Sequence, residues 1–96
     1  MIYEWNGKKA KANLQKHGVS FETAATVFLD PLALTFPDPH HSTEEEREIT
    51  IGHSTSHQVV FVSHCQRGER IRIIGARKAT KGERKQYEEG IAKENR

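Results

Sequence analysis

Three arginines, Arg67, Arg72 and Arg77, are spaced along an apolar segment near the C-terminal end of the sequence. A guanidinium group is planar, stays charged at any working pH and binds two phosphate oxygens at once. Strict alternation along a strand places Arg72 and Arg77 on opposite faces, so both can serve one site only if a bulge intervenes. Gly75 is a plausible position for that bulge. The pattern favours a phosphate-binding site along this segment.

Two histidines and one carboxylate are candidates for moving protons. His64 ends an apolar run beside an arginine-bearing turn, and His17 ends the first predicted helix. An imidazole with its ordinary pKa of ~6.5 suits acid–base chemistry at cellular pH. Each also has a structural interpretation, His64 as an exposed strand-end residue and His17 as a partly buried residue bonded to backbone. Glu46 could accept a proton or simply pair with its neighbour Arg47.

Other reactive residue types favour structural roles. Cys65 is the only cysteine, so no disulfide can form within the chain, and a small buried thiol is the simpler interpretation. Tyr87 most simply packs the last helix onto the sheet, although a phenol can also stack on a base. Asp38, His40 and His41 are metal-ligand types, but this D-x-H-H loop lacks a fourth ligand of known geometry. We therefore expect no metal and no other cofactor.

Composition indicates one soluble domain spanning residues 1–96. The sequence is 34% hydrophobic and 29% charged, which is typical of a chain that forms a packed core. Net charge is only +2, but the cationic residues crowd into 8–16 and 67–85, with acidic residues at 44–48 between them. Local density of Lys and Arg controls phosphate affinity, so this distribution favours a polyanion as partner.

The N-terminal residues carry no basic stretch followed by an apolar one, and no 18 apolar residues run together. With a lone cysteine, these observations predict a cytoplasmic protein that does not contact membranes.

Caps and periodicity predict the helices that must position these residues. Asn6 caps a helix from about Gly7 to His17, and Gly18 ends it. One face of this helix is expected to pack inward: Ala10, Asn13, Leu14 and His17. Ser20 caps a second short helix that ends at Asp30-Pro31. Its expected buried stripe is Phe21, Ala24, Ala25 and Phe28.

Period-two alternation predicts the strands, which are expected over Leu32–Phe36, Arg47–His53, Gln58–His64 and from Ile71 onward. Residues 2–5 read as a short strand or extended arm. Thr80 and Glu83 match a capping box that starts a final helix with Tyr87 and Ile91 facing inward. The prediction is an α+β domain with two N-terminal helices, a four-stranded antiparallel sheet and one C-terminal helix.

Four segments of the sequence together resemble the BrnT family of toxins. They are residues 13–22 (NLQKHGVSFE), Asp30-Pro31, Glu46-Arg47, and residues 72–77 (RIIGAR) followed by Glu83 and Tyr87. Each segment is weakly specific, but their order and spacing agree over nearly the whole chain. Gly75 is a departure, because the family more often carries serine there. A substrate contact through that hydroxyl would be missing from this chain.

The resemblance implies a RelE/ParE-like fold and a ribonuclease that arrests growth until a ribbon-helix-helix antitoxin, BrnA, neutralises it. Metal-independent cleavage needs a proton acceptor, a proton donor and cations for the charge on phosphorus. The residues expected to be catalytic are Arg72, Arg77, His17, His64 and Glu46. Those expected to bind substrate are Arg67, Arg47, Tyr87 and Lys9.

The expected partners are an RNA substrate and the antitoxin, in a heterotetramer that contacts operator DNA only through the antitoxin. Two other functions stay open from the sequence. One is a non-catalytic binder, acting as a gyrase inhibitor or as a corepressor subunit. The other is an RNA-binding module that holds phosphates electrostatically without cutting them.

Overall fold

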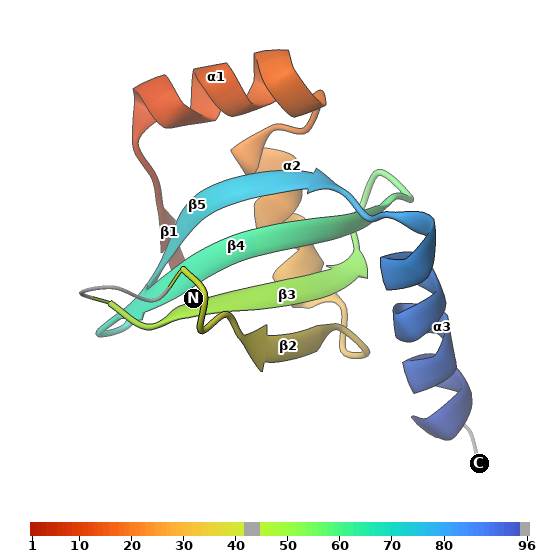
Figure 1. Ribbon diagram of the computed structural model, residues 1–96. Helices are drawn as coiled ribbons and strands as arrows, with labels where there is room; N and C mark the ends of the chain where they lie inside the picture. The colour runs from red at the N-terminus through yellow and green to blue at the C-terminus, as the bar shows by residue number, and fades with distance from the viewer. Residues whose placement is uncertain (42–44, 95–96) are drawn as a thin grey trace.

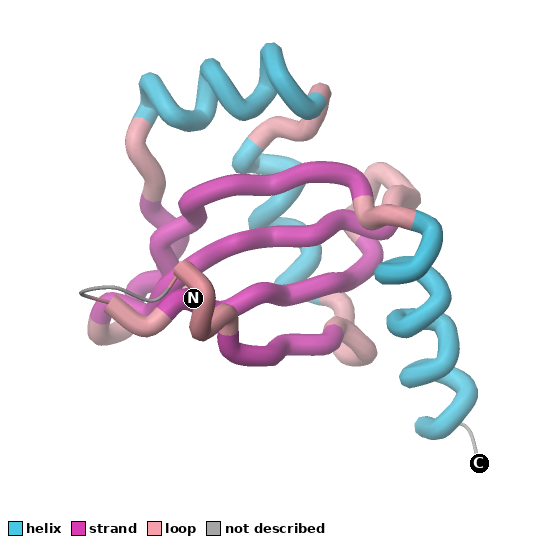
Figure 2. Tube along the Cα trace, viewed as in Figure 1, coloured by secondary structure: helices cyan, strands magenta, loops and turns pink. Residues whose placement is uncertain are grey.

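The computed structural model describes residues 1–41 and 45–94, with side chains described as far as residue 90. Glu44 of the acidic segment and the side chain of Ile91 lie outside this part. The elements follow in chain order (Figures 1 and 2): β1 (Ile2–Glu4), α1 (Gly7–His17), α2 (Phe21–Thr26), the 3-10 segment η1 (Val27–Leu29), β2 (Leu34–Pro37), β3 (Arg47–His53), β4 (Val59–Arg67), β5 (Arg70–Lys78) and α3 (Lys81–Glu94). The protein is an α+β domain, as predicted.

The sheet has five strands in the order β1-β5-β4-β3-β2, so the prediction of four antiparallel strands is wrong. Strands β2 to β5 pair antiparallel, as their short connections require. Strand β1 pairs parallel with β5, with Ile2 opposite Arg70 and Glu4 opposite Arg72. The sequence indicates that residues 2–5 are extended, but no local signal identifies a partner almost 70 residues away.

The predicted helix caps are present. Asn6 Oδ1 accepts the backbone N–H groups of Lys8 and Lys9, and Gly18 ends α1 in the left-handed conformation with φ 70°. Ser20 Oγ accepts the N–H of Thr23 at the start of α2. Thr80 and Glu83 bond each other's backbone N–H groups and form the capping box of α3. These local signals position all three helices at the expected places.

Helix α1 is less buried than predicted. It has no buried residue, Leu14 is 49% exposed and His17 is exposed, because the helix lies along the edge of the sheet rather than over a face (Figure 1). The Asn13 amide attaches it there: Nδ2–H donates to the carbonyl of Ala76, and Oδ1 accepts the Ala76 N–H. The Asn13 side chain thus satisfies the backbone N–H and C=O of Ala76 on β5, beyond the point where β1 ends.

Two hydrophobic clusters lie on opposite faces of the sheet. On one face, α2 and η1 cover Val60, Val62 and Ile73. On the other face, a smaller cluster includes Ile49, Ile51 and Tyr87 of α3. Figure 1 shows that α3 lies at one end of this second face, so most of it has no helix over it. We call it the open face.

Two contacts fix the segments that border the sheet. Gly52 is buried where β3 meets η1, and a Cβ at this position would lie 2.8 Å from Val27 Cγ1 and 2.9 Å from the Ala33 side chain. Only glycine permits this approach. In the second contact, Tyr87 Oη donates to the Asp30 carboxylate and attaches α3 to the turn before β2.

Two strand boundaries differ from the predicted ones. Asp30 forms a turn by accepting the N–H groups of Leu32 and Ala33, so β2 begins at Leu34 rather than Leu32. Strand β4 continues to Arg67 instead of ending at His64. None of the helices in the described part of the chain has the length and apolar character needed to cross a membrane.

Candidate functional site

A bulge in β5 brings Arg72 and Arg77 to the same face of the sheet. Arg77 pairs with Phe61 and Arg72 with Cys65, and these two β4 residues are an even number apart. Opposite Ser63 and His64 the register shifts, so that β5 fits one extra residue between Gly75 and Ile73. The bulge predicted near Gly75 is therefore present, and it is the reason why both arginines lie on the open face.

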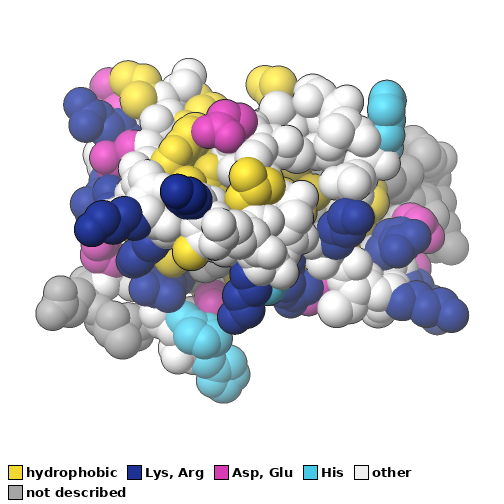
Figure 3. Space-filling model, turned by 90° about the horizontal axis from the view of Figure 1, so that it is seen from above, with side chains coloured by type: hydrophobic (Ala, Val, Ile, Leu, Met, Phe, Trp, Pro, Cys, Tyr) yellow, Lys and Arg dark blue, Asp and Glu magenta, His cyan; other side chains and the backbone are white. Residues whose placement is uncertain are grey.

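A cationic pocket lies at the end of the open face that is remote from α3. It is a hollow of about 250 Å³ lined by Lys9, Glu45, Arg47, Cys65, Arg67, Arg72 and Ile74. Four of these residues are cationic and one is a carboxylate. In the view from above, Lys and Arg side chains gather toward the lower margin, the side of the open face (Figure 3). Four of the nine sequence-predicted site residues, Lys9, Arg47, Arg67 and Arg72, meet in this pocket.

Glu45 occupies the fork of Arg67. Its two oxygens accept from Arg67 Nε and Nη2 at 3.0 and 2.6 Å. This hydrogen-bonded pairing lowers the pKa of Glu45 despite some desolvation, and it raises the pKa of Arg67. Both groups are therefore charged at neutral pH, and Arg67 already has an anionic partner.

Arg72 is held more loosely than Arg67. Its Nη1 lies 3.7 Å from Glu4 Oε2 across the β1–β5 pair, a distance too long for a good hydrogen bond. Its side chain is 27% exposed and lines the pocket. Arg72 therefore keeps donors that an incoming anion can use.

Cys65 lies in the wall of the pocket with its thiol buried, as the sequence predicts. Burial raises the pKa of the Cys65 thiol, and the nearby Glu45 carboxylate, 3.5 Å from Sγ, raises it further. The thiol stays protonated at neutral pH, so Cys65 is unsuited to act as a nucleophile.

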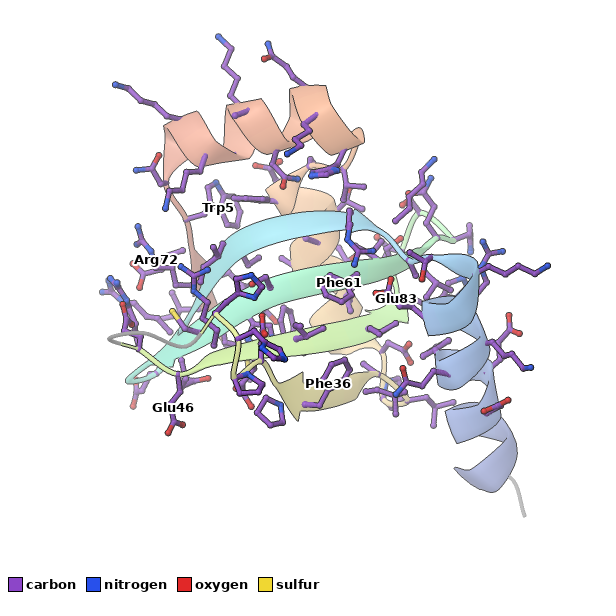
Figure 4. All side chains as sticks on the ribbon, viewed as in Figure 1. Trp5, Phe36, Glu46, Phe61, Arg72 and Glu83 are labelled. Carbon is purple, nitrogen blue, oxygen red and sulfur yellow. The ribbon has the colours of Figure 1, made fainter. Side chains whose placement is uncertain are left out.

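Arg77 lies on the open face but outside the cationic pocket. Its Nη1 and Nη2 donate to the two oxygens of Glu83 at 2.7 and 2.9 Å. Its guanidinium carbon lies over the Phe61 ring, 3.9 Å from the centroid. Figure 4 shows Phe61 and Glu83 toward α3, with Arg72 near the opposite end of the sheet. The structure therefore separates Arg77 from the other predicted arginines.

His64 is 3% exposed on the face covered by α2 and η1, so the predicted position at an exposed strand end is wrong. Its Nε2 lies 2.7 Å from Thr50 Oγ1, and its ring packs edge-on against Phe28. Burial lowers the pKa of His64 to about 4, which keeps it neutral at cellular pH. The structure does not bring His64 together with the arginines.

The remaining predicted site residues lie apart from one another. Glu46 is exposed and lines a second hollow of about 320 Å³, which shares Arg47 with the cationic pocket. His17 is exposed on the last turn of α1. Tyr87 is buried, as predicted for packing, and its pKa rises to about 12 because of burial and its bond to Asp30.

The loop after β2 does not assemble the ligand set weighed from the sequence. His41 Nδ1 pairs with Asp38 Oδ2 at 2.9 Å, and both precede the undescribed segment 42–44. Among the described residues, no three His, Cys, Asp or Glu side chains gather closely enough to hold a metal ion.

Sequence reasoning missed two residues that shape the open face. The sequence indicates Glu45 only as one member of an acidic segment, although Glu45 contacts both Arg67 and Cys65. Phe61 was assigned only to an apolar run, although its ring supports Arg77. The spacing of Glu83 from Arg77 was the available signal for their ion pair, since a strand end followed by a capping box brings the two together.

The arrangement can bind a phosphodiester. Four cationic side chains around one hollow supply charge and directional donors for phosphate oxygens, and carboxylates stand at its edge. A second feature of the same face is a guanidinium held flat on an aromatic ring. Both features suit a nucleic-acid strand lying along the sheet.

Comparisons with known proteins bear on the family and the fold. A family model described as the ribonuclease toxin, BrnT, of type II toxin–antitoxin systems matches residues 5–83. Among solved structures, the fold is similar to that of the Brucella abortus ribonuclease toxin BrnT, with a TM-score of 0.65 and 22% identity. That alignment covers 84% of this chain and 100% of the other. No match was found among curated proteins.

Proposed function

This chain belongs to the BrnT family of ribonuclease toxins of type II toxin–antitoxin systems, and we propose that it is an endoribonuclease that cuts single-stranded RNA at its cationic pocket without a metal ion. The family match supplies the class of activity. The position of the site and the metal independence are proposals that rest on the contacts described above.

The observation that carries the proposal is the convergence of Arg72, Arg47, Arg67 and Lys9 on one hollow. These residues come from β5, β3, β4 and α1, so the fold assembles the pocket from four separate elements. A charge of this density favours a phosphate group and stabilises the extra negative charge that develops during displacement at phosphorus. The side chains themselves supply the positive charge that a divalent cation provides in other nucleases.

In the proposed reaction, the 2′-hydroxyl oxygen attacks the adjacent phosphorus and the bond from phosphorus to the 5′-oxygen of the next nucleotide breaks. The hydroxyl proton passes to a base, and the departing 5′-oxygen takes up a proton. The products are a 2′,3′-cyclic phosphate and a 5′-hydroxyl, so no water and no redox partner enter this step. Arg72 binds the non-bridging oxygens throughout.

Proton transfer is assigned to residues at the edge of the pocket. Glu46 lies in the hollow that shares Arg47 with the pocket, which suits it to accept the 2′-hydroxyl proton. The Lys9 ammonium lines the pocket and can donate to the 5′-oxygen. His64 takes no part in this scheme, because it is buried on the other face.

A type II toxin implies an antitoxin partner and an RNA substrate. We propose a ribbon-helix-helix antitoxin of the BrnA kind, a heterotetramer with it, and operator DNA contacts made only through the antitoxin. We also propose that the chain forms one domain over residues 1–96 and acts in the cytoplasm.

The test is incubation of purified protein with a labelled single-stranded RNA in excess EDTA, with the product ends identified. The expected result is endonucleolytic fragments that carry 2′,3′-cyclic phosphate and 5′-hydroxyl ends. The same RNA with 2′-O-methyl groups is the control and stays intact, because its nucleophile is blocked. Dependence on added metal, or 5′-phosphate ends, would contradict the proposed chemistry. Intact RNA with strong binding would favour a non-catalytic binder.

A further inference from the structure

Both terminal nitrogens of Arg77 already donate hydrogen bonds, which limits how this residue can bind a substrate. Both terminal nitrogens donate to Glu83, and Nη1 also lies 3.4 Å from the carbonyl of Lys78. These contacts raise the pKa of Arg77 and lower that of Glu83 despite partial burial of both groups. A guanidinium paired in this way has few donors left for phosphate oxygens. The flat faces of the group take no part in these hydrogen bonds.

One face of the Arg77 guanidinium is covered and part of the group is open. The guanidinium carbon lies at stacking distance over the Phe61 ring, and Phe61 itself packs against the cluster that contains Ile49, Ile51 and Tyr87. The Arg77 side chain is still 35% exposed. Because Glu83 holds the fork and Phe61 supports the plane, the guanidinium is fixed in orientation before any ligand arrives.

The Arg77 guanidinium and the cationic pocket lie at different positions along β4. Arg77 pairs with Phe61 and Arg72 with Cys65, four residues farther along the strand. At ~3.3 Å per residue the two arginines are roughly 13 Å apart on the same face. They cannot hold the same phosphate, but they can contact different nucleotides of one strand.

From these contacts we infer that the outer face of Arg77, supported by Phe61 and Glu83, stacks on an unpaired base next to the nucleotide whose phosphate enters the cationic pocket. The inference rests on the proposed function and names the form of substrate that the site takes. A base within a duplex has no free face, so the RNA must be single-stranded at this position. Stacking on arginine or aromatic planes is a general mode of single-strand recognition.

The test measures binding of 2′-O-methyl oligonucleotides in which a single abasic residue is moved along the strand. These RNAs are not cut, so binding is read separately from cleavage. At one position the abasic residue should weaken binding to the unmodified protein by about 5- to 100-fold, which is the usual worth of a stacked base. At neighbouring positions the effect should be small.

The same set of RNAs is then bound to protein variants. Arg77→Lys keeps the charge and removes the plane, so the position-specific abasic penalty should disappear. Phe61→Leu keeps an apolar side chain but removes the ring that supports the plane, and the penalty should shrink. Arg84→Lys is the matched control, because Arg84 is exposed on α3 and should leave the penalty intact. The penalty is the ratio of the affinities of one protein for the intact and the abasic RNA. Partial unfolding of a variant lowers both affinities equally and therefore cancels in this ratio.

A penalty that persists unchanged in Arg77→Lys would overturn the inference, as would equal penalties at every position. If the Arg77–Glu83 pair is purely structural, Arg77→Lys should lower the melting temperature and leave the abasic penalty unchanged. A penalty that disappears in Arg77→Lys, combined with no cleavage of ordinary RNA by the unmodified protein, would reject the proposed function and keep the stacking site. Normal cleavage with no Arg77-dependent penalty would reject the stacking site alone.

Discussion

Three arginines of the sheet have the same charge but differ in what already binds them. Glu45 holds the fork of Arg67 and Glu83 holds the fork of Arg77, each through two hydrogen bonds. Among the described residues, Arg72 makes one long ion pair, 3.7 Å to Glu4, and lies within the electrostatic reach of Glu45. A phosphate therefore meets the least competition at Arg72. At the scale of single residues, the carboxylate that already holds each guanidinium determines which of its atoms an incoming ligand can reach.

Neutralising Glu45 tests whether its carboxylate competes with RNA for Arg67. The substitution Glu45→Gln removes the charge that pairs with Arg67, so RNA affinity should rise by roughly two- to fivefold, the scale of an exposed ion pair. The salt dependence should also steepen, by about 0.7 in the slope of log affinity against log salt, for one more phosphate contact. Filter binding at several salt concentrations measures both values.

Glu69→Gln is the control for that experiment, because Glu69 is also exposed, lies in the turn between β4 and β5, and does not line the pocket. It removes the same charge from the same region. A gain in affinity of equal size in both variants would show that only the overall charge matters. It would contradict competition between the Glu45 carboxylate and RNA for Arg67.

The buried imidazole of His64 should make folding sensitive to acid. Burial lowers the pKa of His64 to about 4, below the ~6.5 of an unfolded chain. Between these pH values the unfolded chain binds a proton that the folded chain does not, so stability falls as the pH drops from 6.5 toward 4. The loss is up to about 3 kcal/mol, at ~1.4 kcal/mol per pH unit.

Urea unfolding at a series of pH values measures this loss. His64→Gln keeps a polar partner for Thr50 but does not titrate, so its stability should change less over the same window. Carboxylates with lowered pKa, such as Asp30 and Glu83, affect both proteins equally. If the free energy of unfolding depends on pH in the same way in both proteins, His64 does not take up a proton on unfolding in this pH range.

At the scale of elements, α1 is attached to the edge of the sheet by the Asn13 amide, with Ala10 packed against the main hydrophobic cluster. Asn13 Nδ2 donates to the carbonyls of Val19 and Ala76, and Oδ1 accepts the Ala76 N–H, all at 2.8 to 3.1 Å. The helix buries no residue of its own and brings Lys9 to the cationic pocket. Asn13 therefore attaches the helix that carries Lys9 to the edge of β5.

Removing this amide should loosen α1 and destabilise the chain. Asn13→Ala leaves the buried backbone of Ala76 without its partners, which costs about 1–3 kcal/mol in the free energy of unfolding. Chemical denaturation measures the loss. Gln15→Ala removes an exposed amide from the same helix and should cost less than ~0.5 kcal/mol. Equal losses for the two variants would show that the helix is not attached through Asn13.

At the scale of the whole molecule, local signals in the sequence predict most elements and little of their pairing. Asn6, Ser20 and Thr80 cap helices where their sequence context indicates. The parallel partner of β1 was not predicted, because pairing over almost 70 residues leaves no local trace. The burial of His64 was missed for a related reason, since the strand that contains it continues beyond its apolar run.

The candidate site was partly predictable as well. Arginine spacing and Gly75 together indicated the bulge that puts Arg72 and Arg77 on one face. The partners of Arg72 and Arg67 could not be predicted, because Glu4 and Glu45 come from distant parts of the chain. Residue types therefore indicated a cationic face, and three-dimensional contacts were needed to separate the pocket that contains Arg72 from the Arg77 guanidinium on Phe61.

In the proposed reaction, Arg72 binds the phosphate at which RNA is cut. The most direct measurement compares RNA cleavage in EDTA by Arg72→Ala and by Arg70→Ala, two arginines on one strand, of which only Arg72 lines the pocket. Losing a contact to the developing charge should slow Arg72→Ala by about 100-fold or more, with the far-UV spectrum unchanged. Arg70→Ala should cut at close to the rate of the unmodified protein. Equal rates for Arg72→Ala and Arg70→Ala would contradict the account.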